Sequence, residues 1–294
     1  MKIAFIGFGE AARAFHDSLA VKDGAIGFSA HDVLFGREGM EGSCARAAKE
    51  RGVAVEETVV DAVASADWII SAVTADQSLE AARSAAGHAR RGQIYFDINS
   101  VSPGRKRESA GLLTQAGACY IDMAVMAPVK PRGHRTPVLL AGPLEPAALR
   151  RVEALEFDFD LVGPEPGAAT AIKMVRSLFV KGLEAITVEA MLAASASGCL
   201  DHVLESLEKS YPGLGWPGIA EYNIERMLKH GTRRAAEMRE SAATLDGLGL
   251  HGDLARAIAE AHDLMGALPE RDISGEDFAT GLSRLAASRR RLGR

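Results

Sequence analysis

Lys173 is a residue type able to do acid–base chemistry, and its setting in the sequence is unusual. It lies in AATAIKMVRSLFVKGLEAITVEAMLAA (168–194), which is apolar on most sides and predicts a long helix at the centre of a domain. Helical spacing places Lys173, Ser177 and Glu184 within a stripe of about 40°. A polar stripe on an apolar helix is costly unless it is paired or faces a cleft, so both arrangements are open.

The position of Lys173 favours a cleft, because it follows closely the glycine- and proline-rich hinge in FDFDLVGPEPG (157–167). For Lys181 and Glu184 a structural ion pair is the favoured interpretation. Acid–base work by a lysine requires a pKa drawn towards neutrality by burial or by a cationic neighbour. Arg176, three residues further along, is such a neighbour, and its fork-shaped donors also suit a carboxylate.

The opening segment, MKIAFIGFGEAARAF, offers a second kind of chemistry, the binding of phosphates. Gly7, Gly9 and Ala12 form G-x-G-x-x-A between an apolar run that predicts a strand and an alanine-rich run that predicts a helix. Gly7 permits a tight turn, Gly9 lets a pyrophosphate approach the backbone, and Ala12 lets the helix pack on the sheet. The motif alone also occurs as an ordinary strand–helix turn.

Asp32 strengthens the phosphate-binding interpretation. It stands 25 residues after Gly7, at the end of the second predicted strand. A carboxylate there accepts hydrogen bonds from an adenosine ribose and repels a 2′-phosphate, which favours NAD over NADP. Arg37, in the following loop, tempers that preference, so NADP stays possible. Together these residues predict a dinucleotide-binding site.

Two later strand ends are expected to border the same ligand, because ligands of doubly wound sheets lie at the carboxyl ends of the strands. Val73 and Thr74 follow the fourth predicted strand, and DINSVSP (97–103) contains the end of the next. Ser100 is the predicted ligand contact in that loop. Ser102 is better explained as the cap of a helix that starts at the following proline.

Strands and helices alternate through the first half of the chain and helices alone occupy the second half. The predicted strands are 3–7, 25–30, 53–55, 68–73, 94–98, 119–123 and 138–142, with a last one near 157–162. This order predicts an α/β protein with a Rossmann-type, doubly wound parallel sheet followed by an all-α domain. We therefore expect an NAD(P)-binding domain over 1–162 and an all-helical substrate and dimerisation domain over 163–294.

The composition is that of a globular protein: 47 % of the 294 residues are hydrophobic and 25 % are charged. A formal net charge of −5 argues against a nucleic-acid partner. The three cysteines lack CxxC spacing and the eight histidines lack paired spacing, so neither disulfides nor a metal site is expected. No leader-like or membrane-spanning run is apparent, and a cytoplasmic location is expected.

The order of motifs resembles the β-hydroxyacid dehydrogenase family, which includes 3-hydroxyisobutyrate dehydrogenase, tartronate semialdehyde reductase and 6-phosphogluconate dehydrogenase. The matching motifs are GFGEAA (7–12), NSVSP (99–103), IDMAVMA (121–127) and GAATAIKMVRS (167–177). The continuation KMVRSLFVKGLEA is most similar to a divergent, uncharacterised subgroup of 6-phosphogluconate dehydrogenase-like proteins.

The resemblance implies that Lys173 exchanges a proton with a substrate hydroxyl while a hydride passes between the same carbon and a nicotinamide. With the strand-end argument it implies these cofactor contacts: Gly7, Phe8, Gly9, Glu10, Ala11, Ala12, Asp32, Val73, Thr74 and Ser100. The implied substrate contacts are Ser100, Val101, Met123, Met126, Ala127, Arg176 and Ser177.

The chain departs from the family pattern at two places. Arg176 and Ser177 stand where most relatives have asparagines, and Met126 and Ala127 replace a Ser-Gly pair that holds a substrate carboxylate. These changes weaken the case for the usual small 3-hydroxy acids. An NAD(P)-dependent oxidoreductase acting on a β-hydroxy acid or related β-hydroxy carbonyl compound is the leading hypothesis.

Two alternatives stay open. Imine reductases share the expected architecture, but they usually lack a lysine at the place of Lys173. A dinucleotide-binding sensor without turnover is compatible with the altered substrate motif. The apolar helix 168–194 and the alanine-rich helices after it also predict a homodimer formed through the C-terminal domain.

Overall fold

The computed structural model describes residues 1–273 and 276–292. The chain divides into two compact units, Met1–Lys173 and Met174–Arg294. The boundary lies inside helix α8 (Ala168–Ala196), later than the expected division at 162/163. It lies there because the first turn of α8 is hydrogen-bonded to Asp122 in the sheet of the first unit.

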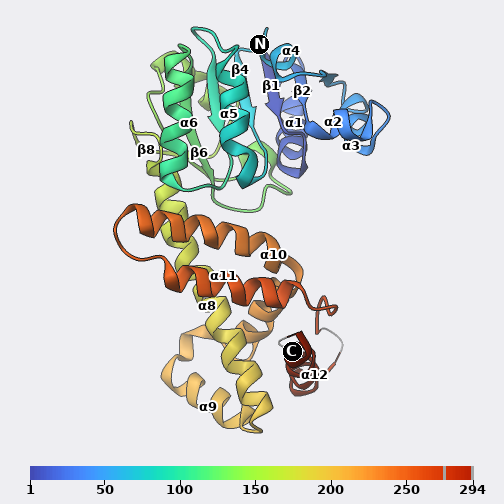
Figure 1. The fold of residues 1–294 in the computed structure, drawn as a ribbon, viewed down its shortest axis with the longest axis vertical. Coiled ribbons are helices and arrows are strands. Elements are labelled where there is room, and N and C mark those ends of the chain that lie inside the picture. Colours follow the sequence, from blue (N-terminus) through green and yellow to red (C-terminus); the bar gives the residue numbers. More distant parts are fainter. Residues whose placement is uncertain (274–275, 293–294) are drawn as a thin grey trace. The chain divides into compact units, whose positions relative to one another are not determined.

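One mostly parallel sheet forms the centre of the first unit. Figure 1 shows this sheet with β1, β2, β4, β6 and β8 labelled. Among the described residues its strand order is β3-β2-β1-β4-β5-β6-β7-β8, and β7 runs antiparallel to β6. The strands are β1 Lys2–Ile6, β2 Gly27–His31, β3 Ala54–Val55, β4 Trp68–Ser71, β5 Ile94–Asp97, β6 Cys119–Val125, β7 Val138–Ala141 and β8 Phe159–Gly163. The predicted doubly wound α/β architecture is confirmed.

Helices cover both faces of this sheet, since successive strand residues point to opposite sides. Ile3 and Phe5 belong to one buried cluster, and Ala4 and Ile6 belong to another. The first cluster packs under α1 (Glu10–Lys22), α2 (Val33–Glu38), α3 (Ser43–Lys49) and α7 (Pro146–Ala154). The second packs under α4 (Val59–Val63), α5 (Ser78–Ala86) and α6 (Pro103–Gln115). Burial on both faces explains the strands' nearly continuous apolar sequence.

Among its described residues, the second unit contains helices joined by turns and loops, and no strand. After the greater part of α8 come α9 (Leu200–Ser210), α10 (Gly218–Gly247), α11 (Asp253–Gly266) and α12 (Phe278–Leu292). Helices α10 and α11 approach closely: a Cβ added at Gly231 would lie 2.3 Å from the carbonyl oxygen of His262. Across the described part of the chain, no helix has the length and apolar character needed to cross a membrane.

Lys181 and Glu184 of α8 each lie against a residue of opposite charge on α10. Lys181 Nζ lies 2.8 Å from Glu237 Oε2, whereas Glu184 accepts a two-pronged contact from Arg234, with Nε 2.9 Å from Oε2. Lys181 and Glu184 thus form structural ion pairs, as expected, each with a residue of α10 instead of with one another. Helical spacing permits that contact, but α10 supplies a partner of opposite charge to each residue.

A buried histidine in the second unit is expected to make this unit sensitive to acid. His262 is fully buried, its Nε2 contacts the carbonyl oxygen of Lys181 at 3.2 Å, and Nδ1 has no hydrogen-bond partner among the described residues. Burial lowers the pKa of His262, although Glu184 Oε2 lies 3.9 Å from Nε2. Protonation would place an additional N–H where the described residues offer no acceptor.

We predict that His262→Gln becomes progressively more stable than the parent as the pH falls below about 6.5, the unperturbed pKa of histidine. In the parent, the unfolded chain binds this proton before the folded chain does, so stability is lost on acidification. The difference should approach about 1.4 kcal/mol per pH unit in urea unfolding experiments. The exposed His202→Gln is the control, and an equal response of both variants would contradict the prediction.

Candidate active site

The residues predicted to contact ligands follow neighbouring parallel strands. Gly7 follows β1, Asp32 follows β2, Val73 lies shortly after β4, and Ser100 comes after β5. Strand β1 lies between β2 and β4, so the chain order reverses about β1. Such a switch point at the carboxyl edge is where open α/β sheets bind ligands. The sheet therefore brings these four positions to one edge.

The two glycines of the first loop serve different purposes. Gly7 has a φ of +85°, and a Cβ there would lie 2.4 Å from the carbonyl oxygen of Ala72, so packing requires glycine. Gly9 is the N-cap of α1, and a Cβ there would meet nothing within 4 Å. Since packing does not explain Gly9, its bare backbone is available to a ligand. Unpaired N–H groups at the start of α1 suit a pyrophosphate.

Asp32 is held in place by backbone donors. Its Oδ2 accepts from Phe8 N at 2.7 Å and its Oδ1 accepts from Leu34 N at 2.9 Å. The side chain of Phe8 is fully buried, so Phe8 orients Asp32 instead of presenting its ring to a ligand. Each carboxylate oxygen accepts more than one hydrogen bond, which leaves capacity for ribose hydroxyls.

The other predicted cofactor residues surround these loops. Ala12 is fully buried on the face of α1 that packs on the sheet, as predicted from its small size, and Ala11 packs partly against the same core. The Glu10 side chain is exposed, with Lys130 Nζ 3.7 Å from its Oε1. The side chain of Val73 lies against Gly7, and the exposed Thr74 is the N-cap of the short 3₁₀ helix Ala75–Gln77.

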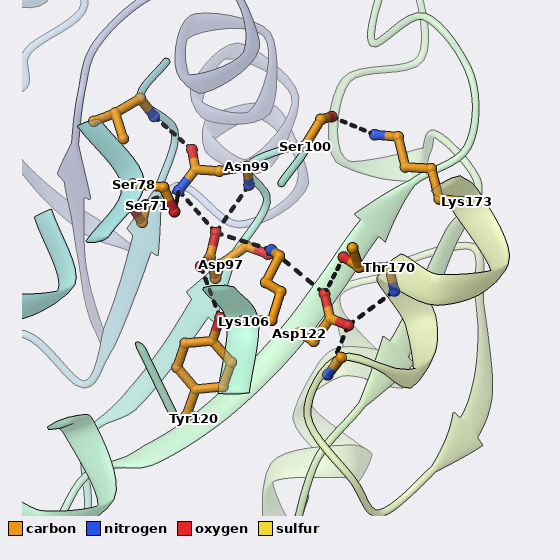
Figure 2. A network of polar contacts seen from close by, with 12 residues as sticks. Ser71, Ser78, Asp97, Asn99, Ser100, Lys106, Tyr120, Asp122, Thr170 and Lys173 are labelled. Atoms are coloured by element: carbon orange, nitrogen blue, oxygen red, sulfur yellow. Dashed lines mark hydrogen bonds and ion pairs between the residues drawn. The ribbon is translucent and has the colours of Figure 1, made fainter. Parts of the chain in front are cut away.

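Lys173 and Ser100 meet although 73 residues separate them. Lys173 Nζ donates to Ser100 Oγ at 2.6 Å, and both residues are partly accessible (Figure 2). Ser100 lies in the loop between β5 and α6, while Lys173 lies just past the first turn of α8. Ser102 and Pro103 are the N-cap and first residue of α6, as predicted. The geometry thus joins the two side chains most able to exchange protons with a bound hydroxyl or carbonyl group.

A buried ionic triad that the sequence analysis missed lies beside this pair (Figure 2). The triad consists of Asp97, Lys106 and Asp122, all fully buried. Lys106 Nζ lies 3.0 Å from Asp97 Oδ1 and 3.4 Å from Asp122 Oδ1, and it donates to the backbone oxygen of Asp97 at 2.7 Å. The signal in the sequence was an aspartate in each of two apolar strand runs, IYFD and CYID.

Further hydrogen bonds satisfy Asp97. It accepts from Asn99 N at 2.9 Å and from Asn99 Nδ2 and Tyr120 Oη at 2.7 Å each. Burial and the charge of Asp97 raise the pKa of Tyr120 well above its usual value, so Tyr120 remains a hydrogen-bond donor. Asn99 Oδ1 accepts from Val73 N at 2.7 Å. The amide of Asn99 thus ties two strand-end loops together and is not available to a substrate.

The predicted substrate residues fall into three groups. Val101 and Met123 are buried in the first unit, which argues against contact between their side chains and a substrate. Met126 is half-buried and Ala127 is exposed, just beyond β6. Arg176 and Ser177 belong to the second unit, where Arg176 is exposed and Ser177 Oγ accepts from Lys181 Nζ at 3.1 Å.

Two family models match parts of the chain. One, described as NADP oxidoreductase, coenzyme F420-dependent, matches residues 2–100. The other, described as a domain of unknown function, DUF1932, matches residues 194–265. The first match spans the glycine loop and Asp32, which is consistent with a nicotinamide dinucleotide as the cofactor.

Solved structures resemble the chain over most of its length. A conserved hypothetical protein from Sinorhizobium meliloti 1021 is 33 % identical, covers 98 % of this chain and 96 % of its own, and has a TM-score of 0.80. The conserved protein MTH1747, of unknown function and structurally similar to 3-hydroxyacid dehydrogenases, is 30 % identical over 90 % of this chain and 96 % of its own, with a TM-score of 0.71.

The fold is also that of a known dehydrogenase. The 3-hydroxyisobutyrate dehydrogenase of Mycobacterium tuberculosis, solved with L-serine, has a TM-score of 0.71 at 19 % identity and covers 97 % of this chain and 98 % of its own. Together with the two more similar proteins, this likeness confirms the resemblance carried by the motifs. The chain belongs to the β-hydroxyacid dehydrogenase, or 6-phosphogluconate dehydrogenase-like, family, in a divergent subgroup of uncharacterised proteins.

Proposed function

We propose that the protein is an NAD(P)-dependent dehydrogenase or reductase acting on a β-hydroxy acid or a related β-hydroxy carbonyl compound. The observation that carries the proposal is the hydrogen bond between Lys173 and Ser100 at the ligand-binding edge of the sheet. A lysine beside a hydroxyl at such an edge suits reversible proton transfer to a substrate oxygen.

The residues of the first unit fit a nicotinamide dinucleotide. The backbone at Gly9 and the start of α1 would hold its pyrophosphate, and Asp32 would hold the adenosine ribose. When bound, this cofactor accepts or supplies the hydride of the redox step. Val73 and Thr74 are proposed to border it through their backbone.

Lys173 is proposed to act as the general acid and base. In oxidation, neutral Lys173 Nζ removes the proton of the substrate hydroxyl as the carbon loses its hydride. In reduction, the ammonium returns that proton to the new alkoxide oxygen. Ser100, hydrogen-bonded to Nζ, orients the amine and presents its own hydroxyl to the substrate oxygen.

The substrate class follows from the departures of this chain. Met126 and Ala127 would make the substrate site more apolar than the Ser-Gly pair of most relatives does. Arg176 is proposed to bind the substrate carboxylate in a bidentate fork, with Ser177 nearby on the same helix. We therefore expect a substrate that carries a carboxylate or similar hydrogen-bond acceptor, with the reacting hydroxyl on the carbon β to it. The substrate is also expected to be larger than the smallest 3-hydroxy acids.

Asp32 is expected to make the protein prefer NADH. We predict that Asp32→Asn lowers the NADPH dissociation constant relative to the NADH dissociation constant by about tenfold or more. The substitution removes a negative charge that repels the 2′-phosphate of NADPH and that binds the ribose hydroxyls of NADH. Fluorescence titration with each nucleotide measures the ratio. Glu38→Gln is the control, since Glu38 is the last residue of α2, the helix that Asp32 caps. An unchanged ratio in Asp32→Asn would show that Asp32 does not select the cofactor.

The activity is tested by a screen of β-hydroxy acids with NAD and NADP, and of the matching carbonyl compounds with NADH and NADPH. Turnover coupled to a change in nucleotide absorbance supports the proposal. Nucleotide binding without turnover across the panel would favour a sensor, and the absence of nucleotide binding would remove every oxidoreductase interpretation.

A homodimer is also proposed, on the basis of one face of α8. Val175, Phe179 and Ile186 follow helical spacing along this face in the second unit, and all are exposed, Phe179 by 73 %. An apolar stripe of this kind suits a second copy of the chain. Phe179→Asp is expected to convert the dimer to a monomer by light scattering, whereas Lys209→Asp on α9 should not. A monomeric parent would contradict the proposal.

A reducing compartment such as the cytoplasm is proposed as the location. Cys44, Cys119 and Cys199 are all free. Burial, with a smaller contribution from Glu145, raises the pKa of Cys119 to about 11, which makes this thiol unreactive. Free cysteines of this kind are typical of proteins that function where disulfides do not form.

A further inference from the structure

We propose that the buried triad Asp97–Lys106–Asp122 is a positioning unit that holds Lys173 against Ser100. This inference rests on the proposed function in one respect, namely that Lys173 is the general acid and base. The carboxylates of the triad hold the end of β5 and the start of α8, next to Ser100 and Lys173. The triad acts through the two backbone segments that carry them.

The triad begins with two carboxylates that face one another. Strands β5 and β6 are parallel neighbours, and their register pairs Asp97 with Asp122. Like charges at such paired positions destabilise a sheet, most of all when both are buried. Lys106 Nζ contacts both carboxylates and so relieves their repulsion. Lys106 lies in the first turn of α6, where the helix dipole disfavours a cation, so helix stability does not explain it.

One arm of the triad sets the loop that carries Ser100. Asp97 ends β5, and its carboxylate accepts both the backbone N–H and the side-chain amide of Asn99. These two bonds, closed within three residues, determine the direction in which the chain leaves the strand. Ser100 is the next residue, so the path of the backbone at Asn99 determines where the Ser100 hydroxyl lies.

The other arm sets the start of α8. Asp122 Oδ2 accepts from Gly167 N at 3.1 Å and from Thr170 N at 2.9 Å, while Oδ1 accepts from Thr170 Oγ1 at 2.7 Å. A carboxylate at a helix N-terminus satisfies free N–H groups and interacts favourably with the dipole. Lys173 lies one turn beyond Gly167–Thr170, so the same contacts set the position and rotation of its Cα.

Close packing leaves this arm little freedom. Gly167 has a φ of +97°, and a Cβ there would lie 2.9 Å from the backbone oxygen of Pro103, the first residue of α6. The starts of α6 and α8 are therefore in near contact, with Lys106 on one and Thr170 on the other. The 2.6 Å contact between Lys173 and Ser100 depends on both arms being held together by Lys106.

The alternative is that the triad only stabilises the fold. The two explanations differ in what happens to Lys173 when the attachment of the triad to α8 is weakened without removing a charge. Thr170→Val weakens it, because the substitution keeps the volume of the side chain and deletes its hydrogen bond to Asp122, while the two backbone hydrogen bonds to Asp122 remain. Thr170→Ser restores the hydroxyl. Ser109→Ala is the matched control, since Ser109 is buried one turn after Lys106 and its Oγ has no partner among the described residues.

The experiment is competitive acetylation of the full-length protein with trace acetic anhydride, without substrate or nucleotide. The reaction is followed from about pH 6 to 11, which spans the usual range of lysine pKa values. Peptide mass spectrometry gives the rate at Lys173 relative to the exposed Lys209 in each variant. NADH binding and thermal unfolding are measured on the same samples, which shows that each variant is folded.

A positioning role predicts that Thr170→Val raises the relative rate at Lys173 by about tenfold or more, the range expected for losing one hydrogen bond to a charged acceptor. Thr170→Ser should return it to the parent value, and Ser109→Ala should leave it unchanged. A folded Thr170→Val protein with the parent's Lys173 profile would overturn the inference. Because acetylation needs no turnover, an inactive protein that shows the shift would refute the proposed function alone.

Discussion

Replacing Lys173 by methionine is expected to lower kcat by about 10²–10⁴-fold, the range typical of a lost general acid or base. The methionine keeps most of the side-chain volume but cannot exchange a proton with a substrate oxygen. Fluorescence titration should show NADH affinity close to that of the parent, because the proposed cofactor contacts lie on Gly9, Asp32 and their neighbours. Steady-state kinetics with the best substrate of the screen measures the loss.

Two further variants sharpen this test. Lys209→Met, an exposed lysine on α9, should leave kcat unchanged. Ser100→Ala should cause a smaller loss than Lys173→Met, since it removes the partner of the amine and keeps the amine itself. Full activity in Lys173→Met would disprove the mechanism while leaving dinucleotide binding intact.

Replacing Lys106 by methionine is expected to cost the first unit about 3–5 kcal/mol of unfolding free energy, as is usual when one partner of a buried ionic group is removed. Asp97 and Asp122 would then face each other without a cation in a site with no exposure to solvent. Urea unfolding followed by the fluorescence of Trp68, which is buried in the sheet, measures the loss. Total stabilities of domains are only about 5–15 kcal/mol, so this loss is large.

The added substitution Asp122→Asn provides the internal check. In Lys106→Met/Asp122→Asn one of the two facing charges is gone, so the double variant should lose less than the sum of the single losses. Strict additivity, or a loss below about 0.5 kcal/mol in Lys106→Met, would mean that the triad is not electrostatically coupled.

The residues proposed to hold the cofactor were identified from local sequence, and their binding role stays a prediction. The glycines, Ala12 and Asp32 are recognisable because each is required by the backbone path or chemistry of one strand–helix junction. Periodicity then ordered the strands and helices, since a strand buried on both faces must be apolar throughout. The position of Lys173 followed from a motif in one helix.

Contacts between distant segments could not be predicted in the same way. Whether Phe8, Val101 or Met123 presents a side chain to a ligand depends on which face of the sheet is covered, and all three are buried. Lys181 and Glu184 have suitable spacing for a pair, yet each finds its partner on α10. Sequence spacing describes what one element permits, whereas burial and competing partners come from other elements.

The sequence by itself determined the kind of protein this is. It predicted a doubly wound sheet with a glycine loop and an acidic residue suited to a dinucleotide, followed by a set of helices, the first of which carries Lys173 near its start. Those features arise from short-range sterics and hydrophobic periodicity, which act within one segment. Only the tertiary structure decided that Lys173 meets Ser100 and that Asp97, Lys106 and Asp122 share one buried site. Strand register and helix packing determine which distant residues come into contact. A charge that is removed from water requires hydrogen-bonding or oppositely charged partners, and these come from whichever elements pack around it.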